Sequence, residues 1–318
     1  MNKKKIDLSN MSALIVLIAL CVVLSIAEPT FRGFNNIINI LQQVTVIAVL
    51  ALGVNVVIFT GGIDISVGSI VAFTGIVMGK IIVEAGMPSP VGIAVALLIG
   101  AACGTFNGLM ISKFKLQPMI ATLAMMSMAR GAALTLADGE TITGYSKAFR
   151  WIGSGTIPGT QIPVQILFMV ALYIIFFYVM KYRKFGRYIY SIGGNEEATR
   201  LSGINVDKYK TLAYTLSGLC AAIASVILVS KLNSAQSTAG LDYEMDAIAS
   251  CVIGGTSLLG GFGSVWGTFV GAIIMIVIRN GLNLLNVSSN LQKLVIGIVI
   301  LLAVLADAIR HKAASGKK

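Results

Sequence analysis

The stretch KYRKFGRYIYSIGGNEEATRLSGINVDKYK, residues 181–210, is the longest strongly charged segment of a chain that is otherwise apolar. Its second half carries the signals of a short helix. Asn195 can cap the helix, and Glu196 and Glu197 fall in the first turn, where the positive end of the helix dipole favours carboxylates. Gly203 is suited to the helix stop. The pattern predicts a short amphipathic helix that the basic residues on either side hold at a membrane surface. A docking element for a soluble partner would have this form. A solvated loop with one helical turn is the alternative.

The composition outside this stretch is that of a membrane protein. Apolar residues make up 56% of the 318 and charged residues only 12%, whereas soluble chains carry about 25% charged residues. The net charge of +11 is confined to a few loops between apolar runs, which argues against a nucleic-acid partner. The cysteines lie in apolar stretches without paired spacing, so they predict neither a metal site nor a disulfide. The single histidine, His311, lies in the basic tail and does not predict a metal site either.

Ten apolar runs are each long enough, or nearly so, to cross the hydrocarbon core as a helix, which takes about 20 residues. They cover residues 11–27, 37–59, 67–85, 91–111, 118–137, 164–180, 211–230, 243–259, 264–285 and 291–309. The first run follows three lysines and ends at small residues, Ser25 and Ala27, so a cleaved signal peptide is an alternative to a retained helix. The eighth run is the weakest, because acidic residues crowd its start. Residues 138–163, rich in Gly, Thr and Ser, predict a surface hairpin or a short interfacial helix.

The basic residues orient these spans. With ten spans, the two termini, the loop around Lys113 and residues 181–210 share one side, which holds 16 of the 24 Lys and Arg residues. The opposite side holds five, and three lie within or at the edges of spans. Since cytoplasmic loops are enriched in Lys and Arg, both termini and residues 181–210 are expected to be cytoplasmic. The predicted fold class is an all-α polytopic membrane bundle, a single transmembrane domain over residues 1–318.

No motif for an enzyme is present: the sequence lacks a GxxxxGK[ST] nucleotide-binding loop, HExxH and GxSxG. Two glycine-rich segments interrupt the apolar pattern instead, GGIDISVGS at 61–69 and GGTSLLGGFGSVWG at 254–267. Glycine beside Asp and Ser at membrane depth is typical of broken helices that line a pathway. The simpler interpretation is a pair of tight turns, with Asp64 capping the third span.

Polar side chains inside spans are costly unless they face protein or water. Those that could contact a solute are amides, a carboxylate and a hydroxyl: Asn39, Gln43, Asn55, Asp64, Ser66 and Asn107. Amides without embedded carboxylate pairs suit a neutral hydroxylated solute better than an ion, although each amide could simply join two helices. Arg130 is the most costly embedded residue and requires a partner or an aqueous face. Glycines at every fourth position, at 100, 104 and 108 and at 263, 267 and 271, predict close helix packing.

Three segments, GGIDISVGS (61–69), SIGGNEEATRLSGINV (191–206) and IGGTSLLGGFGSVWGT (253–268), resemble in content and order the signatures of the ribose-type sugar ABC importer permeases. The resemblance extends over essentially the whole chain. It implies a multi-pass permease of the bacterial inner membrane that binds no cofactor itself. ATP and Mg²⁺ would be bound by a separate ABC ATPase subunit. The other implied partners are a periplasmic or lipid-anchored sugar-binding protein and a second permease copy or paralogue, all in membrane lipid.

The resemblance also implies that part of residues 181–210 is the coupling helix that docks on the ATPase. The residues matching the family pattern are Gly194, Asn195, Glu196, Glu197, Ala198, Arg200 and Gly203, and Thr199 stands where the family usually has Ala. Transport would then be alternating access driven by ATP. Two alternatives stay open: an ion-coupled secondary transporter or channel, and, within what the resemblance implies, a permease for a non-sugar solute such as autoinducer-2. A membrane-embedded lipid enzyme lacks any catalytic constellation.

Overall fold

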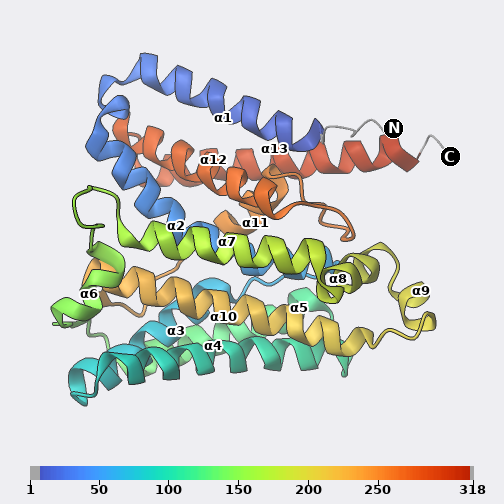
Figure 1. The fold of residues 1–318 in the computed structure, drawn as a ribbon, viewed down its shortest axis with the longest axis horizontal. Coiled ribbons are helices and arrows are strands. Elements are labelled where there is room, and N and C mark those ends of the chain that lie inside the picture. The colour runs from blue at the N-terminus through green and yellow to red at the C-terminus, as the bar shows by residue number, and fades with distance from the viewer. Residues whose placement is uncertain (1–7, 316–318) are drawn as a thin grey trace.

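The computed structural model describes residues 8–315, which form a bundle of helices lying roughly along one axis (Figure 1). Eight helices are long and apolar enough to cross a membrane within this part of the chain. They are α2 (Phe34–Phe59), α3 (Val67–Gly79) with its π-helical continuation (Lys80–Glu84), α4 (Ser89–Ser112), α5 (Pro118–Ala137), α7 (Val164–Tyr182), α10 (Val206–Leu232), α12 (Val265–Leu284) and α13 (Ser289–Ser315). These correspond to eight of the ten predicted spans. Proline lies within the first two positions of α4 and α5, where its missing N–H costs no helical hydrogen bond.

The other two predicted spans differ in length. The first corresponds to α1 (Leu8–Ala27), whose described apolar part is Ala13–Ala27. The eighth was predicted to continue to residue 259, but α11 (Tyr243–Ile253) has only 11 residues. At about 1.5 Å per residue it is roughly 16 Å long, which is half a membrane crossing. It ends at two consecutive glycines, of which Gly255 has φ of +87°, a conformation that a helix cannot include.

Helix α2 is the centre of the bundle. Every residue from 44 to 60 is buried, and α2 contacts α7, α10, α11 and α12. The second predicted span therefore forms the core of the protein. Helix α13, in contrast, is mostly exposed, so its apolar side chains remain for lipid or for another chain.

The glycines spaced by four residues pack α4 against α10, as predicted. A Cβ at Gly104 would collide with the carbonyl oxygen of Tyr214, and one at Gly108 would lie 2.6 Å from the Cα of Thr211. The two helices run side by side along much of their length (Figure 1). The second series does the same for α12, where Gly271 lies against the backbone of Ser250 on α11. Backbone-to-backbone contact of this kind depends on the absence of side chains.

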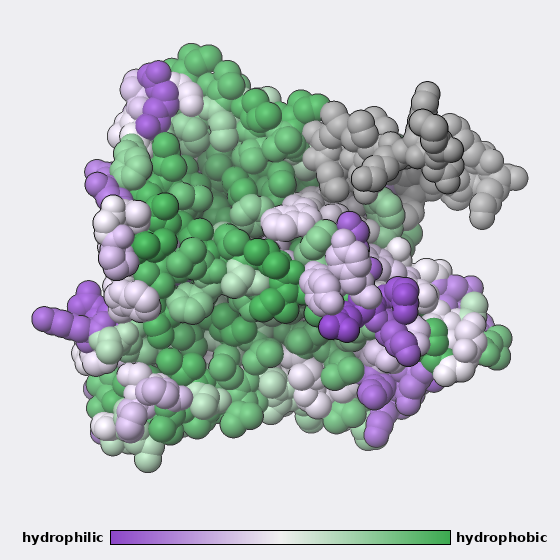
Figure 2. Space-filling view, viewed as in Figure 1, coloured by the Kyte–Doolittle hydropathy of each residue, from purple (hydrophilic) through white to green (hydrophobic). Residues whose placement is uncertain are grey.

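The two ends of the bundle are polar and the belt between them is apolar (Figure 2). At one end lie α8 (Lys184–Gly194) and α9 (Glu196–Leu201), with the start of α1 and the end of α13 (Figure 1). At the other lie the 3₁₀ helix η1 (Pro29–Arg32), α6 (Lys147–Ser154), and a small antiparallel pairing of β1 (Ile142–Thr143) with β2 (Ser234–Ala235). Residues 138–163 thus contain the predicted short surface helix, whereas their strand β1 pairs with the distant β2 and does not form a local hairpin.

Candidate functional site

The segment predicted as a docking helix forms α9, and its ends follow the sequence signals. The side-chain oxygen of Asn195 accepts a hydrogen bond from the backbone N–H of Ala198 at 2.9 Å, which caps the helix. Glu196 and Glu197 occupy the first turn. Gly203, just past the end, has φ of +82°. The predicted helix of residues 195–203 is therefore confirmed as local structure.

A network of ion pairs attaches α9 to the membrane helices. The Glu196 carboxylate accepts from Lys210 on α10 at 2.5 Å and from Arg200 at 3.3 Å. Arg200 also donates to Asp207 on α10 at 2.8 Å, and Asp207 accepts from Lys115, in the turn between α4 and α5, at 3.0 Å. Burial raises the pKa of Glu196, but the Lys210 and Arg200 donors outweigh it, so the pKa lies below its usual value.

The outer surface of α9 is free of contacts with the described part of the chain. Leu201 is 84% exposed, and a Cβ at either Gly194 or Gly203 would meet open space. Glu197 is exposed and pairs with no cation among the described residues. The sequence did not single out Leu201, although a leucine at the end of a charged helix is a recognisable signal of an apolar contact.

The helix α8, which the sequence did not predict, lies between α9 and the glycine-rich segments. Its buried face carries Ile189 and Ile192. Near its end, Gly193 lies against the carbonyl oxygen of Phe59 and the backbone of Gly260 and Gly261. Gly261 N–H donates to the Phe59 carbonyl at 3.0 Å. The three segments 61–69, 191–206 and 253–268 therefore meet at one end of the bundle.

The first glycine-rich segment leads into a closed polar network. Asp64 Oδ1 accepts from the N–H of Ser66 at 3.0 Å and from its hydroxyl at 2.6 Å, while Oδ2 accepts from Ser217 Oγ at 2.8 Å. Asn107 Nδ2 donates to Ser66 Oγ at 3.0 Å. Asp64 orders the residues just before α3, but it does not cap the helix as predicted, because Ser66 holds the N-cap position and no side-chain cap hydrogen bond forms there. Three of the predicted solute residues are thus brought together, with Ser217 as a fourth member that the sequence did not indicate.

The remaining predicted solute residues lie elsewhere on α2. Asn55 is buried and accepts from Thr256 Oγ1 in the second glycine-rich segment at 2.8 Å. Asn39 and Gln43 lie toward the other end of α2 and are joined by a 3.1 Å hydrogen bond. The structure therefore divides the six residues among three places. Arg130 has the partner it required, since its Nη1 donates to the carbonyl oxygens of Ser237 and Ala239 at 2.6 and 2.8 Å.

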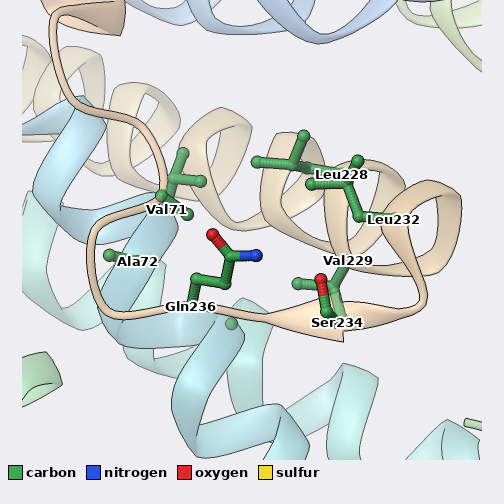
Figure 3. A pocket seen from close by; sticks show the side chains of 9 residues that line it. Val71, Ala72, Leu228, Val229, Leu232, Ser234 and Gln236 are labelled. Atoms are coloured by element: carbon green, nitrogen blue, oxygen red, sulfur yellow. The ribbon is translucent and has the colours of Figure 1, made fainter. Parts of the chain in front are cut away.

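A small pocket between α3 and α10 shows how tightly this part of the bundle is closed. Gln236, in the loop after β2, extends toward Val71 of α3 and Leu228 of α10 (Figure 3). The cavity is only about 10 Å³, which is at the limit for a single water molecule. No solute can pass at this point without movement of α3 or α10.

Residues 36–304 match the family described as branched-chain amino acid transport system / permease component. Among curated proteins, the chain is 46% identical over 305 residues to the ribose import permease protein of Escherichia coli K12, with 94% of each chain covered. The ribose import permease protein of Bacillus subtilis is 45% identical over 92% of this chain and 90% of its own. The D-allose transport system permease protein of E. coli K12 is 34% identical over 91% and 88%. No solved structure matches.

Proposed function

Since this chain belongs to the family of branched-chain amino acid transport system permease components, we propose that it is the membrane permease subunit of an ATP-driven importer of a ribose-like monosaccharide. The observation that carries the proposal is the nearly full-length similarity, at 46 and 45% identity, to two ribose permeases. The family description names amino acids, but the relatives at 34% identity are named for allose and arabinose. A sugar is therefore favoured over an amino acid as the solute.

The ATPase subunit of this importer docks on α9 in our proposal, through Gly194, Asn195, Glu196, Glu197, Ala198, Arg200 and Gly203. Three features support this assignment: α9 lies at the end of the bundle, its outer surface is free of contacts with the described chain, and Leu201 offers an exposed apolar contact. At the opposite end, α6 presents Lys147, Arg150 and the half-exposed Trp151. This surface suits a sugar-binding protein with an acidic face.

Movement of α9 would reach the pathway by two routes. The ion pairs through Glu196, Asp207 and Lys115 connect α9 to α10 and to the turn between α4 and α5. Gly193 on α8 touches the backbone of Phe59, at the end of α2, and that of Gly260 and Gly261 in the second glycine-rich segment, which precedes α12. Coupling between an ATP site and a solute site requires an element that both sites bias. The α8–α9 pair has the contacts for that role.

The solute path runs beside α2 in this proposal, past Asn39 and Gln43 at one end and Asn55 at the other. The network of Asp64, Ser66 and Asn107 would be the closed region between them. Its residues are buried, and Asn107 Oδ1 has no hydrogen-bond partner among the described residues. An unpaired buried acceptor costs free energy, so this network is poised to exchange partners when α3 moves.

Uptake of a panel of labelled solutes tests the proposal. A strain lacking this gene, with and without a plasmid copy, would be supplied with ribose, allose, arabinose, autoinducer-2 and a branched-chain amino acid. We expect plasmid-dependent uptake of a pentose or hexose that persists when an ionophore dissipates ion gradients and stops when ATP is depleted. Uptake that the ionophore abolishes while ATP remains high would support an ion-coupled transporter instead.

A further inference from the structure

We propose that the end of α7 and the first turns of α8 bind the headgroups of anionic phospholipids. The binding surface, called the basic patch below, consists of four basic residues and two tyrosines: Lys181, Arg183, Lys184, Arg187, Tyr178 and Tyr182. All four basic side chains are exposed. Within residues 8–315 none of them forms an ion pair. This role is independent of which solute the permease transports.

The basic patch lies in a part of the chain that has no acidic side chains. No Asp or Glu occurs from residue 141 to residue 195. The next carboxylate along the chain, Glu196, already accepts from Lys210 and Arg200. Asp207 on α10 accepts from Arg200 as well. Because the neighbouring carboxylates are paired with other cations, the charge of the basic patch is left to attract anions from outside the chain.

The exposed face of α7 leads directly into the basic patch. Ile174, Tyr178 and Tyr182 are exposed and follow one another at intervals of four residues, so they form one stripe along the helix. An exposed apolar stripe on a membrane-spanning helix faces lipid, and tyrosine is enriched where the hydrocarbon core meets the headgroups. Figure 2 shows hydrophilic residues gathered over the ends of α7 and α8, directly beside the apolar belt. The basic patch therefore lies at the level of the headgroups.

Aromatic rings hold two of the cations on the lipid-facing side of α7. The Nζ atom of Lys181 lies 5.0 Å from the centre of the Phe177 ring and 5.5 Å from that of Tyr182. The Cζ atom of Arg183 lies 5.0 Å from the centre of the Tyr178 ring. These distances fall within the range of cation–π contacts, about 6 Å. Both cations are thus kept beside the lipid and away from α9, which favours a lipid headgroup over an acidic protein surface.

The fold of α8 places the other two cations at the same level. Gly186 lies against the backbone of Met180, where a Cβ would collide, so α8 starts closely packed on the end of α7. Ile189 is buried, whereas Lys184 and Arg187, three residues apart, share the exposed face. An amphipathic helix with bases on its outer face is typical of the membrane interface. In the predicted orientation this is the cytoplasmic leaflet, whose anionic lipids attract juxtamembrane bases.

Trp266 on α12 provides a reporter for the lipid beside the basic patch. It is 39% exposed, and the centre of its ring lies 5.8 Å from that of Phe177, on which Lys181 stacks. Trp151→Phe removes the other tryptophan of the chain. The full-length permease is reconstituted in phosphatidylcholine vesicles that contain increasing amounts of either phosphatidylglycerol or phosphatidylcholine with brominated acyl chains. Since bromine quenches a neighbouring tryptophan, the two titrations compare how much of each lipid lies beside the patch.

Brominated phosphatidylglycerol is expected to quench Trp266 at a mole fraction at least fivefold lower than brominated phosphatidylcholine does. Lys181→Gln with Arg183→Gln should lower this preference at least threefold, because each base near the surface attracts anionic lipid. The charge-preserving exchange Lys181→Arg with Arg183→Lys should keep it. Lys147→Gln with Arg150→Gln removes the same charge from α6, at the opposite end of the bundle, and should leave it unchanged. Equal quenching by both lipids in the reporter protein, or an equal loss in both glutamine variants, would overturn the patch.

Binding of the ATPase subunit distinguishes a lipid from a protein partner. The Lys181→Gln, Arg183→Gln variant should co-purify with the ATPase in the same ratio as the wild type does, because the two bases lie outside α9. Loss of the ATPase from this variant, together with an unchanged preference for phosphatidylglycerol, would assign the two bases to an acidic protein surface and contradict the lipid site.

Discussion

Glu196 is where α9 meets α10, and its carboxylate shows how one residue holds the proposed coupling helix. It accepts from Lys210 and Arg200, and exposed ion pairs of this kind contribute only about 0.2–1 kcal/mol each. Because the folded-state pKa is lowered, the stabilisation is present above the usual glutamate pKa of about 4.3. It is lost as the pH falls through the lower folded value.

Glu196→Gln removes these charge pairs while keeping the size of the side chain. We expect the backbone amides of residues 196–201 to exchange with deuterium about two- to fivefold faster at pH 7, following the ion-pair energy. The same difference is expected from pH 6 to 8 and should disappear in acid, where wild-type Glu196 is protonated. The control is Glu197→Gln, which breaks no described ion pair. Equal exchange in Glu196→Gln and wild type at pH 7 would mean that the ion pairs do not hold α9.

The sequence indicated some residues of the site and missed others for a physical reason. The cap at Asn195 and the stop at Gly203 are local, so residue type and spacing predict them. Asp207 and Lys115 lie 92 positions apart, and Asp246 and Arg279 lie 33 apart. Nothing in the local pattern says that such pairs will meet, because the packing of helices decides it.

Helices were predicted well where an apolar run ended at a strong signal. The prediction for residues 118–137 coincides with α5, which has Pro118 at its start and Asp138 in a left-handed conformation at its end. The prediction for the eighth span, residues 243–259, was too long, because the apolar pattern continues past the glycines that end α11. The sequence also missed α8, because six of the eleven residues of that helix are Lys, Arg, Ser or Gly, and its burial against the bundle is a tertiary effect.

The packing of α4 on α10 makes a prediction at the level of the element. Gly104→Ala places a methyl group on the Tyr214 carbonyl oxygen, and overpacking typically costs about 1–3 kcal/mol. Gly131→Ala, on α5, is the same substitution where a Cβ meets nothing, so it should be neutral or slightly stabilising. We expect Gly104→Ala to lower the thermal unfolding temperature of the permease in detergent by several degrees relative to Gly131→Ala. Coincident unfolding curves would contradict the close-packing account.

The orientation of the whole molecule follows from the charge distribution. The end with α8 and α9 is predicted to face the cytoplasm, because 16 of the 24 Lys and Arg residues lie on that side of the predicted spans. Ser154 on α6 and Ser191 on α8 are both exposed, and α6 and α8 lie at opposite ends of the bundle (Figure 1). In intact cells, a membrane-impermeant thiol reagent should label Ser154→Cys and leave Ser191→Cys unlabelled. The reverse labelling would invert the molecule and place α9 out of reach of any cytoplasmic ATPase.

The central claim is that α9 transmits ATP-driven closure to the membrane helices. A variant with two substitutions in and after α9, Glu197→Lys and Gly203→Val, tests this claim. Glu197→Lys places a cation in the first turn, where the helix dipole disfavours it. Gly203→Val forces a branched side chain into a positive φ, which costs about 1–2 kcal/mol of conformational free energy.

The most direct measurement is ribose uptake, together with ATP hydrolysis stimulated by loaded binding protein, in proteoliposomes of the complete complex. The wild type, the Glu197→Lys, Gly203→Val double variant and Gly131→Ala as a handling control would be compared at equal amounts of inserted permease. We expect the double variant to insert normally and to lose both uptake and stimulation, while Gly131→Ala keeps both. Wild-type uptake and stimulation in the double variant would show that the coupling element lies elsewhere in the chain.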